Sequence, residues 1–312
     1  MPGAHSLYNK QMYKAEIAIS GAGIIGLSLA LELHRRGAPV TLIDAHKPGI
    51  ASTAAAGMLA ANDPENPATL RDLSLYSLAL YPDFLARTEE ASGLTVPIQT
   101  HYTQQYVHDG SATLLKEDSL NPRHLHAALL QAARNKGIAV QTEAVDAEIT
   151  VDCTGAWSRP LIQPAKGQML RVLLQGGELH REDLGNFVLR TPHLYIVPRL
   201  DGTALIGATV EDAGFSTSTD EEELLRLRTR AAEILPSIAH APQVEAWAGL
   251  RPRSADGLPV LGELTPNRFI ATGHFRNGIL LAPATAETMA ELILGGTSPI
   301  ELEAFSPARF TS

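Results

Sequence analysis

The sequence predicts an α/β protein in which a nucleotide-binding domain is assembled from separated segments and carries an inserted antiparallel, sheet-rich domain. Three observations lead to this fold class. A strand, a glycine-rich turn and an amphipathic helix follow one another over residues 15–37. The middle of the chain is rich in strand-like runs, such as 166–174 and 203–208. A further strand and an apolar helix occupy 268–287, so both ends of the chain are α/β in character.

The domain boundaries follow from where these patterns change. We expect the nucleotide-binding domain to be discontinuous and to comprise residues 13–61, 119–165 and 250–312. The inserted substrate domain then comprises residues 62–118 and 166–249. No repeat or long linker divides the chain further, which favours two interleaved domains for a chain of this length.

Composition excludes several classes of protein. The formal net charge is −9 and no basic run of five residues occurs, which argues against a nucleic-acid partner. No apolar run approaches the roughly 20 residues that span a bilayer, and the first residues lack the apolar core of a signal peptide. We therefore expect a cytoplasmic protein with no membrane partner. Cys153 is the single cysteine and the histidines show no metal-ligand spacing, so no metal site is expected.

The first glycine cluster is a dinucleotide-binding motif. Gly21, Gly23 and Gly26 form G-x-G-x-x-G between a strand and a helix, and Asp44 ends the next strand. The first glycine permits a tight turn, the second lets a pyrophosphate approach the backbone, and the third lets helix and strand pack closely. The N–H groups at the helix start would bind phosphate, and Asp44 would accept hydrogen bonds from ribose. This Rossmann-like unit alone suits NAD or FAD equally well.

Two later glycine segments favour the flavin. Gly155 follows a strand in DCTGAWS, and Gly273 precedes Asn277-Gly278 at the start of the apolar helix. A flavin extends past the pyrophosphate and needs more of the protein than a nicotinamide does. A helix starting at Asn277 would aim its N–H groups and positive dipole end at the flavin edge. The three separated segments thus predict bound FAD.

Six blocks of sequence together resemble the glycine oxidases of the D-amino-acid oxidase flavoprotein family, which are linked to thiamine biosynthesis. The resemblance covers nearly the whole chain, in the blocks GAGIIGLSLALEL, ASTAAAGMLA, KGQMLRV, LYIVPR, AGLRPRSADGLPVLG and GHFRNGILLAPAT. The last two blocks are the most specific. Relative to the family, the segment from about Gly93 to Leu120 is shorter and the loop after Val145 is trimmed. The substrate domain is therefore expected to be reduced and its pocket more open to water.

The resemblance also implies the site residues. It places Tyr195, Arg251 and Arg276 around the substrate carboxylate. At the position of Asp44 the family also has an acidic residue, more often Glu. The implied cofactor-binding set is Gly21, Gly23, Ile24, Ile25, Gly26, Asp44, Thr53, Ala54, Ala55, Ala56, Gly57, Met58, Val145, Thr154, Gly155, Trp157, Arg251, Gly273, His274, Arg276, Asn277, Gly278 and Ile279.

The residue types fit this chemistry. The Arg251 guanidinium could grip a carboxylate with two parallel hydrogen bonds, which lysine could not match. Tyr195 and His193 would share one face of a strand and could both face a pocket. Neither paired carboxylates nor a Ser/His/Asp set is needed, because flavin oxidation of an amine depends mainly on alignment and electrostatics.

The implied reaction is a hydride transfer from the Cα of glycine, or of another small amino acid or amine, to flavin N5. Reoxidation by O2 would give hydrogen peroxide, and the imine would hydrolyse or pass to thiazole synthesis, which implies a functional link to a thiazole synthase. Two alternatives stay open: a dehydrogenase that uses a quinone or carrier, and a non-catalytic FAD-binding protein. A homo-oligomer is also left open.

Overall fold

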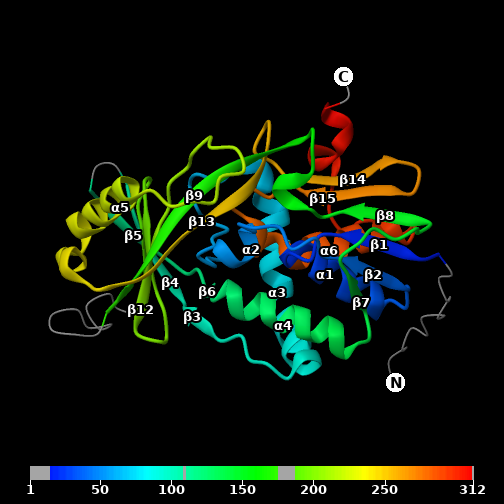
Figure 1. Ribbon diagram of the computed structural model, residues 1–312, viewed down its shortest axis with the longest axis horizontal. Coiled ribbons are helices and arrows are strands. Elements are labelled where there is room, and N and C mark those ends of the chain that lie inside the picture. The colour runs from blue at the N-terminus through cyan, green and yellow to red at the C-terminus, as the bar shows by residue number, and fades with distance from the viewer. Residues whose placement is uncertain (1–14, 108–109, 175–186, 311–312) are drawn as a thin grey trace, which may run out of the picture.

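The computed structural model describes residues 15–107, 110–174 and 187–310 (Figure 1). Its first sheet has the strand order β14-β15-β8-β1-β2-β7 and is parallel except for the β14–β15 pair. The strands are β1 (Ile17–Ser20), β2 (Val40–Ile43), β7 (Ala139–Gln141), β8 (Ile149–Asp152), β14 (Val260–Thr265) and β15 (Arg268–Thr272). The sheet therefore combines segments from three distant parts of the chain, as the sequence predicts. It fills the side of the molecule on which both described ends of the chain lie (Figure 1).

A second sheet lies on the opposite side of the molecule (Figure 1). Its strand order is β13-β9-β12-β11-β10-β4-β5, and it is antiparallel except for the β10–β4 pair. The strands are β4 (Tyr102–Tyr106), β5 (Ala112–Leu115), β9 (Ile162–Leu173), β10 (Phe187–Arg190), β11 (Tyr195–Pro198), β12 (Thr203–Gly207) and β13 (Gln243–Ser254). β3 (Ile98–Thr100) and β6 (Ser119–Leu120) form a separate two-stranded ladder.

Helices cover both sheets. The helices are α1 (Ile24–Arg35), α2 (Ala51–Ala54), α3 (Arg71–Ser92), α4 (Pro122–Asn135), α5 (Glu221–Ile234) and α6 (Gly278–Ile293). The short 3-10 helices are η1 (Ala68–Leu70), η2 (Gly155–Trp157), η3 (Pro236–His240), η4 (Glu303–Phe305) and η5 (Pro307–Phe310). The largest apolar core joins α1, α3, α4 and α6 to the first sheet, and a smaller one lies between α5 and the second sheet.

The expected domain boundaries fall inside two long strands. The divisions at 165/166 and 249/250 cut β9 and β13, which pair with each other along nearly their whole length. These two strands therefore run continuously from one sheet region toward the other and link them. The exact boundaries stay a prediction, and the first two residues of the segment 13–61 lie outside the described residues.

The apolar helix α6 is buried on almost every face. It contains a proline, and side chains of α3 bond to the backbone carbonyls near that proline. Pro283 has no N–H to donate to the carbonyl of Ile279 four residues earlier. The Tyr81 hydroxyl of α3 donates to that carbonyl at 2.5 Å instead. Ser77 acts beside it, donating to the carbonyl of Leu280 at 2.6 Å. These bonds hold the first turns of α6 in position against α3.

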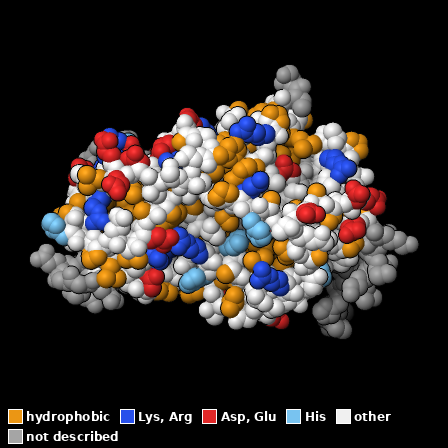
Figure 2. All heavy atoms as spheres, in the orientation of Figure 1, with side chains coloured by type: hydrophobic (Ala, Val, Ile, Leu, Met, Phe, Trp, Pro, Cys, Tyr) orange, Lys and Arg blue, Asp and Glu red, His pale blue; other side chains and the backbone are white. Residues whose placement is uncertain are grey.

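Figure 2 shows basic and acidic side chains interspersed over the visible face of the molecule, with no continuous basic stripe. No helix among the described residues is both long enough and apolar enough to cross a membrane.

Candidate active site

A cavity of about 1080 Å³ is lined by residues from both sheets and their connecting loops. Its walls bring together distant parts of the chain: the turn after β1, the segment 50–58, the turn after β8, strand β13 and the loop before α6. Twenty of the predicted site residues line it: Gly21, Gly23, Ile24, Ile25, Asp44, Ala54, Ala55, Ala56, Gly57, Met58, Thr154, Gly155, Trp157, Tyr195, Arg251, His274, Arg276, Asn277, Gly278 and Ile279. One cavity is therefore lined by most of the predicted cofactor-binding residues and by all three residues predicted to surround the substrate carboxylate.

The first glycine turn packs too tightly for side chains. Gly21 has φ of +108°, and a Cβ there would lie 2.3 Å from the carbonyl oxygen of Cys153. A Cβ on Gly26 would lie 1.9 Å from the carbonyl oxygen of Gly21. Gly26 therefore does not line the cavity but lets α1 pack against β1, which is the role its place in the motif predicts.

The start of α1 lies at the wall of the cavity. Its N-cap residue, Gly23, has no side chain to cap the first N–H groups. The Ile24 N–H donates to Ser52 Oγ at 2.8 Å, and Asp44 lines the same cavity just after β2. N–H donors for a pyrophosphate and a carboxylate for ribose thus occur together, so these residues fit an ADP group. Ser52 was not predicted; its place in the small-residue block was the only signal for it.

The segment 51–58 forms a thin wall of small side chains because strand β13 and a buried arginine hold its backbone in position. A Cβ on Gly249 would lie 2.4 Å from the Cβ of Ala54, so the two backbones approach closely. The Trp247 indole N–H donates to the carbonyl of Ala54 at 3.1 Å. The buried Arg199 guanidinium donates to the carbonyl of Ala56 at 2.6 Å. Backbone carbonyls of this wall are thus held from the side of the second sheet.

The turn after β8 is organised by one carboxylate. Asp152 Oδ1 accepts hydrogen bonds from the N–H of Thr154 at 2.9 Å and from the Ser158 hydroxyl at 2.9 Å. Gly155 then adopts φ of +65° and opens η2, which carries Trp157 to the cavity wall. The glycine is needed here because other residues rarely take this backbone conformation.

The loop before α6 and the first residues of that helix line the cavity. Asn277 is the N-cap and α6 begins at Gly278, as the sequence predicts. His274 is buried and its Nε2 lies 2.9 Å from Thr285 Oγ1. Burial lowers the pKa of this imidazole to about 3, so the ring is neutral at ordinary pH. The side chain therefore supports the loop and contributes no charge to the helix terminus.

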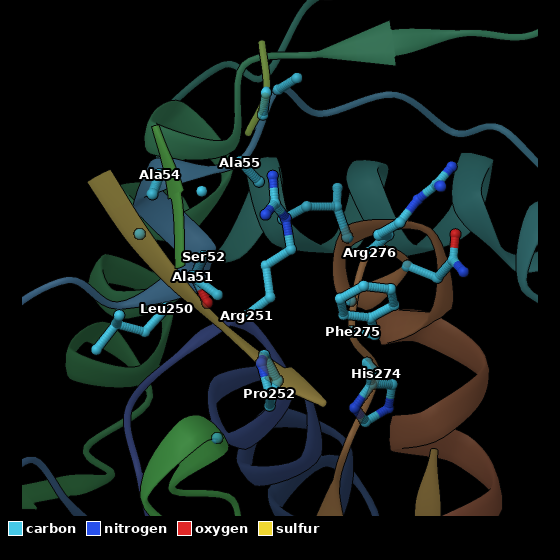
Figure 3. A pocket seen from close by; sticks show the side chains of 18 of the residues that line it. Ala51, Ser52, Ala54, Ala55, Leu250, Arg251, Pro252, His274, Phe275 and Arg276 are labelled. Atoms are coloured by element: carbon cyan, nitrogen blue, oxygen red, sulfur yellow. The ribbon is translucent and has the colours of Figure 1, made fainter. Parts of the chain in front are cut away.

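Arg251 extends from β13 into the cavity (Figure 3). A Cβ on Gly167 of the neighbouring strand β9 would lie 2.2 Å from Arg251 Nη1, so the guanidinium lies directly against that glycine. Nη1 donates to the carbonyl of Thr209 at 2.9 Å. Among the residues that the structure describes, no carboxylate forms an ion pair with Arg251. The cation is therefore positioned by backbone and remains able to bind an anion.

Tyr195 lies at the start of β11, against a glycine of the next strand. A Cβ on Gly207 would lie 2.9 Å from its ring, and the Tyr195 hydroxyl contacts Met169 Sδ at 3.7 Å. His193 also lines the cavity but is exposed in the turn that precedes the strand. The prediction that both residues share one face of a strand is therefore wrong. Tyr195 lies in the strand and His193 in the turn before it, although both line the same cavity.

Arg276 lines the cavity on the side of α6, and its side chain runs away from Arg251 (Figure 3). Its Nη2 lies 2.7 Å from Asp63 Oδ2, and its Nη1 pairs with Glu65. Both acids line the same cavity. Sequence reasoning missed them, because an Asp and a Glu in a loop carry no signal of a partner more than 200 residues away.

Three further predicted residues lie outside the cavity wall. The carbonyl of Thr53 accepts a hydrogen bond from Arg123 Nε at 3.2 Å. Gly273 has φ of +75° in the turn before α6. Val145 is half-buried, while its neighbours Thr142 and Ala144 line the cavity. Among the described residues no cluster of three or more His, Cys, Asp or Glu side chains could hold a metal ion.

The two sheets, the glycine turn at the start of α1 and the second helix start at Gly278 define the arrangement of a flavin-dependent oxidoreductase. The chain belongs to the FAD dependent oxidoreductase family, whose model matches residues 16–106 and 109–292. FAD is therefore its cofactor, as the sequence predicts.

Individual relatives narrow the comparison. The chain is 33% identical to the bifunctional protein ThiO/ThiG of Trichormus variabilis over 360 aligned residues, which cover 95% of this chain and 55% of that protein. It is 29% identical to the glycine oxidase of Bacillus licheniformis, covering 93% of this chain and 96% of that one. The chain thus spans about half the length of the ThiO/ThiG relatives. The alignment is also longer than the 312 residues of the chain, so the relative carries segments that this chain lacks.

A solved structure supports the same fold. The crystal structure of glycine oxidase from Geobacillus kaustophilus superimposes with a TM-score of 0.85 at 25% sequence identity. The superposition covers 94% of this chain and 98% of that chain.

Proposed function

We propose that this chain oxidises glycine or another small amino acid or secondary amine, with bound FAD supplying the two-electron acceptor. The observation that carries the proposal is Arg251, a guanidinium that points into the cavity without a carboxylate partner among the described residues. A carboxylate bound there would form charge-assisted hydrogen bonds with a group already held in position. The names of the relatives, glycine oxidase and ThiO, support this substrate class.

The residues of the chain divide the remaining tasks. The first turns of α1 and Asp44 would hold the ADP half of FAD, and the small-residue wall 54–58 would lie along its flavin half. The N–H groups at Gly278 and Ile279 would bind the polar edge of the flavin ring at the positive end of the α6 dipole. Arg251 orients the substrate carboxylate, and Tyr195, whose hydroxyl contacts Met169 Sδ, lines the same cavity. Alignment is the main contribution of the protein.

No side chain needs to act as a base. The buried imidazole of His274 is neutral and bonded to Thr285, and the substrate amine loses its proton to solvent before the Cα hydride is transferred. The product is an imine, which hydrolyses to an α-keto acid and ammonia, or an alkylamine when the substrate is N-alkylated, or passes to thiazole synthesis. We propose that O2 then takes the electrons and forms hydrogen peroxide. The pairing of ThiO with ThiG in one relative supports a functional link to thiamine biosynthesis.

The test is anaerobic reduction of the purified protein by a panel of amino acids and N-methylglycine, followed by admission of air. The protein should be yellow, should release FAD on denaturation, and should lose its flavin absorbance with a small amino acid. Rapid return of colour with formation of hydrogen peroxide identifies an oxidase. Slow return in air but fast return with a quinone identifies the dehydrogenase alternative. Failure of every amine in the panel to reduce the flavin contradicts the proposal.

A further inference from the structure

Arg251 and Arg276, two of the arginines that line the cavity, differ in what their guanidinium groups contact. Arg251 donates to a backbone carbonyl, that of Thr209, at 2.9 Å. Arg276 instead pairs through each of its two terminal nitrogens with a different carboxylate, those of Asp63 and Glu65. A guanidinium offers a limited set of donors in a fixed plane. Each terminal nitrogen of Arg276 is therefore already engaged by a carboxylate of the chain, with which a ligand carboxylate would have to compete.

This pairing is not a loose surface contact. The Asp63 side chain is only 8% exposed and also lies 4.0 Å from Nη1 of the buried Arg190. Burial lowers the pKa of Arg276, but the carboxylates of Asp63 and Glu65 outweigh it and leave that pKa above its ordinary value. Charges interact more strongly in such surroundings than in water. A second ligand carboxylate would compete with Asp63 and Glu65 for Arg276.

The local charge opposes such a competitor. Arg190 pairs with the buried carboxylate of Glu117 at 2.9 Å, and Asp63 lies between Arg190 and Arg276. The cluster thus contains three carboxylates, Asp63, Glu65 and Glu117, against two guanidinium groups, and its formal charge is −1. An additional anion brought to this wall meets like charge, and repulsion of this kind is a recognised source of specificity.

We propose that Asp63 and Glu65 restrict the site to amines that carry one carboxylate, by occupying Arg276 and leaving Arg251 as the carboxylate-binding guanidinium. This inference rests on the proposed amino-acid oxidation and specifies which substrates that reaction accepts. Glycine and N-methylglycine belong to the accepted class. N-carboxymethylglycine, which is iminodiacetate, has a second carboxylate on the nitrogen substituent and is excluded. Removing one acid should free one end of Arg276 to bind that second carboxylate.

The variants Asp63→Asn and Glu65→Gln test this directly. Asn keeps the Oδ1 acceptor that the Glu65 N–H uses at 3.0 Å, so the loop turn is preserved. Arg190 keeps Glu117 as its partner in both variants. Asp212→Asn is the matched control, because Asp212 also pairs with an arginine, Arg253, but neither residue lines the cavity.

Two measurements separate this inference from the proposed function. The first is kcat/KM for iminodiacetate divided by that for N-methylglycine. The second needs no turnover: it is the ratio of the dissociation constants of diglycolate and methoxyacetate, the ether analogues of those two substrates, from flavin difference spectra. Wild-type protein and the control should favour the monocarboxylate in both. Each test variant should raise the relative preference for the dicarboxylate at least about tenfold.

The outcomes are distinct. Wild-type protein that accepts the dicarboxylate as well as the monocarboxylate overturns the inference, as do unchanged ratios in both variants. If Asp63→Asn fails to fold, the half-exposed Glu65 still decides the question through Glu65→Gln. If no amine reduces the flavin, the proposed function fails, and the ether analogues still report whether the two acids exclude a second carboxylate.

Discussion

Arg251 and Gly167 lie on neighbouring strands, and a Cβ at position 167 would come within 2.2 Å of Arg251 Nη1. The absence of a side chain on β9 is therefore what allows the guanidinium to lie where it does. The approach is far below ordinary van der Waals contact, so the long arginine side chain must move if a methyl group is added.

Gly167→Ala should consequently weaken substrate binding through Arg251. We expect KM for glycine to rise at least about tenfold, equivalent to roughly 1.4 kcal/mol, while FAD remains bound. The double variant Gly167→Ala/Arg251→Ala should be no worse than Arg251→Ala alone, because the two changes act on one interaction. Additive losses in the double variant would show that Gly167 acts through something other than Arg251.

Arg251→Ala should nearly abolish flavin reduction by amino acids. Losing one partner of a buried charge-assisted contact costs roughly 2–5 kcal/mol, or about 30- to several-thousand-fold in kcat/KM. Arg251→Lys should recover only part of this, because it lacks the two-pronged geometry. Arg253→Ala is the control: it lies two residues along the same strand, pairs with Asp212 and does not line the cavity. Stopped-flow reduction that is equally impaired in both alanine variants would place the carboxylate site elsewhere.

The rate of flavin reduction should rise toward alkaline pH and follow the pKa of the substrate amine. The His274 imidazole is neutral because burial lowers its pKa to about 3, so it does not titrate in this range. His274→Gln and His193→Ala should therefore keep the same rising limb when the reductive half-reaction is measured from pH 6 to 10. A limb that flattens or moves by a full pH unit in either variant would identify a protein base.

Folding stability should fall below neutral pH partly because of His274. Its pKa is about 3 in the folded protein against about 6.5 in an unfolded chain. Between these values the unfolded state binds a proton that the folded state does not, so the free energy of unfolding decreases as pH falls. The contribution is about 2 kcal/mol between pH 7 and pH 5. His274→Gln, which retains a group able to contact Thr285, should lose that part of the difference in urea titrations at the two pH values; an unchanged difference would contradict the assignment.

Glycine should bind weakly. The sequence predicts that the segment 93–120 is shorter than in the resembled family, and a pocket opened in this way would have a higher effective dielectric around Arg251. We expect an apparent affinity in the millimolar range or weaker, about 4 kcal/mol of binding, together with tolerance of N-alkylated substrates. Turnover measured across protein concentrations that span any dissociation shows whether a second subunit closes the site. Submicromolar affinity for glycine in a confirmed monomer would refute the open pocket.

The sequence by itself determined the local parts of this protein. The turn at Gly21 and the start of α6 at Gly278 are specified within a few residues, by glycine at a positive φ or by helix-start signals, and both occur as predicted. The split first sheet was likewise foreseen from where α/β segments occur. Strand β14 was not foreseen; only its first three residues belong to one of the blocks that carry the resemblance, and the strand becomes evident only from its pairing with β15.

Only the tertiary structure decided what each charged side chain contacts. Arg276 was expected beside the substrate carboxylate, yet its partners are Asp63 and Glu65, more than 200 residues away. Arg251 owes its position to Gly167, which lies on the paired strand β9 two residues from Ala165, the residue opposite Arg251 in the register. Propensity and periodicity describe neighbours along the chain, whereas these contacts depend on which strands pair and in what register. For that reason the sequence predicted most of the residues that line one cavity, whereas the fold determined that Arg276 pairs with two acids and that Arg251 has no carboxylate partner among the described residues.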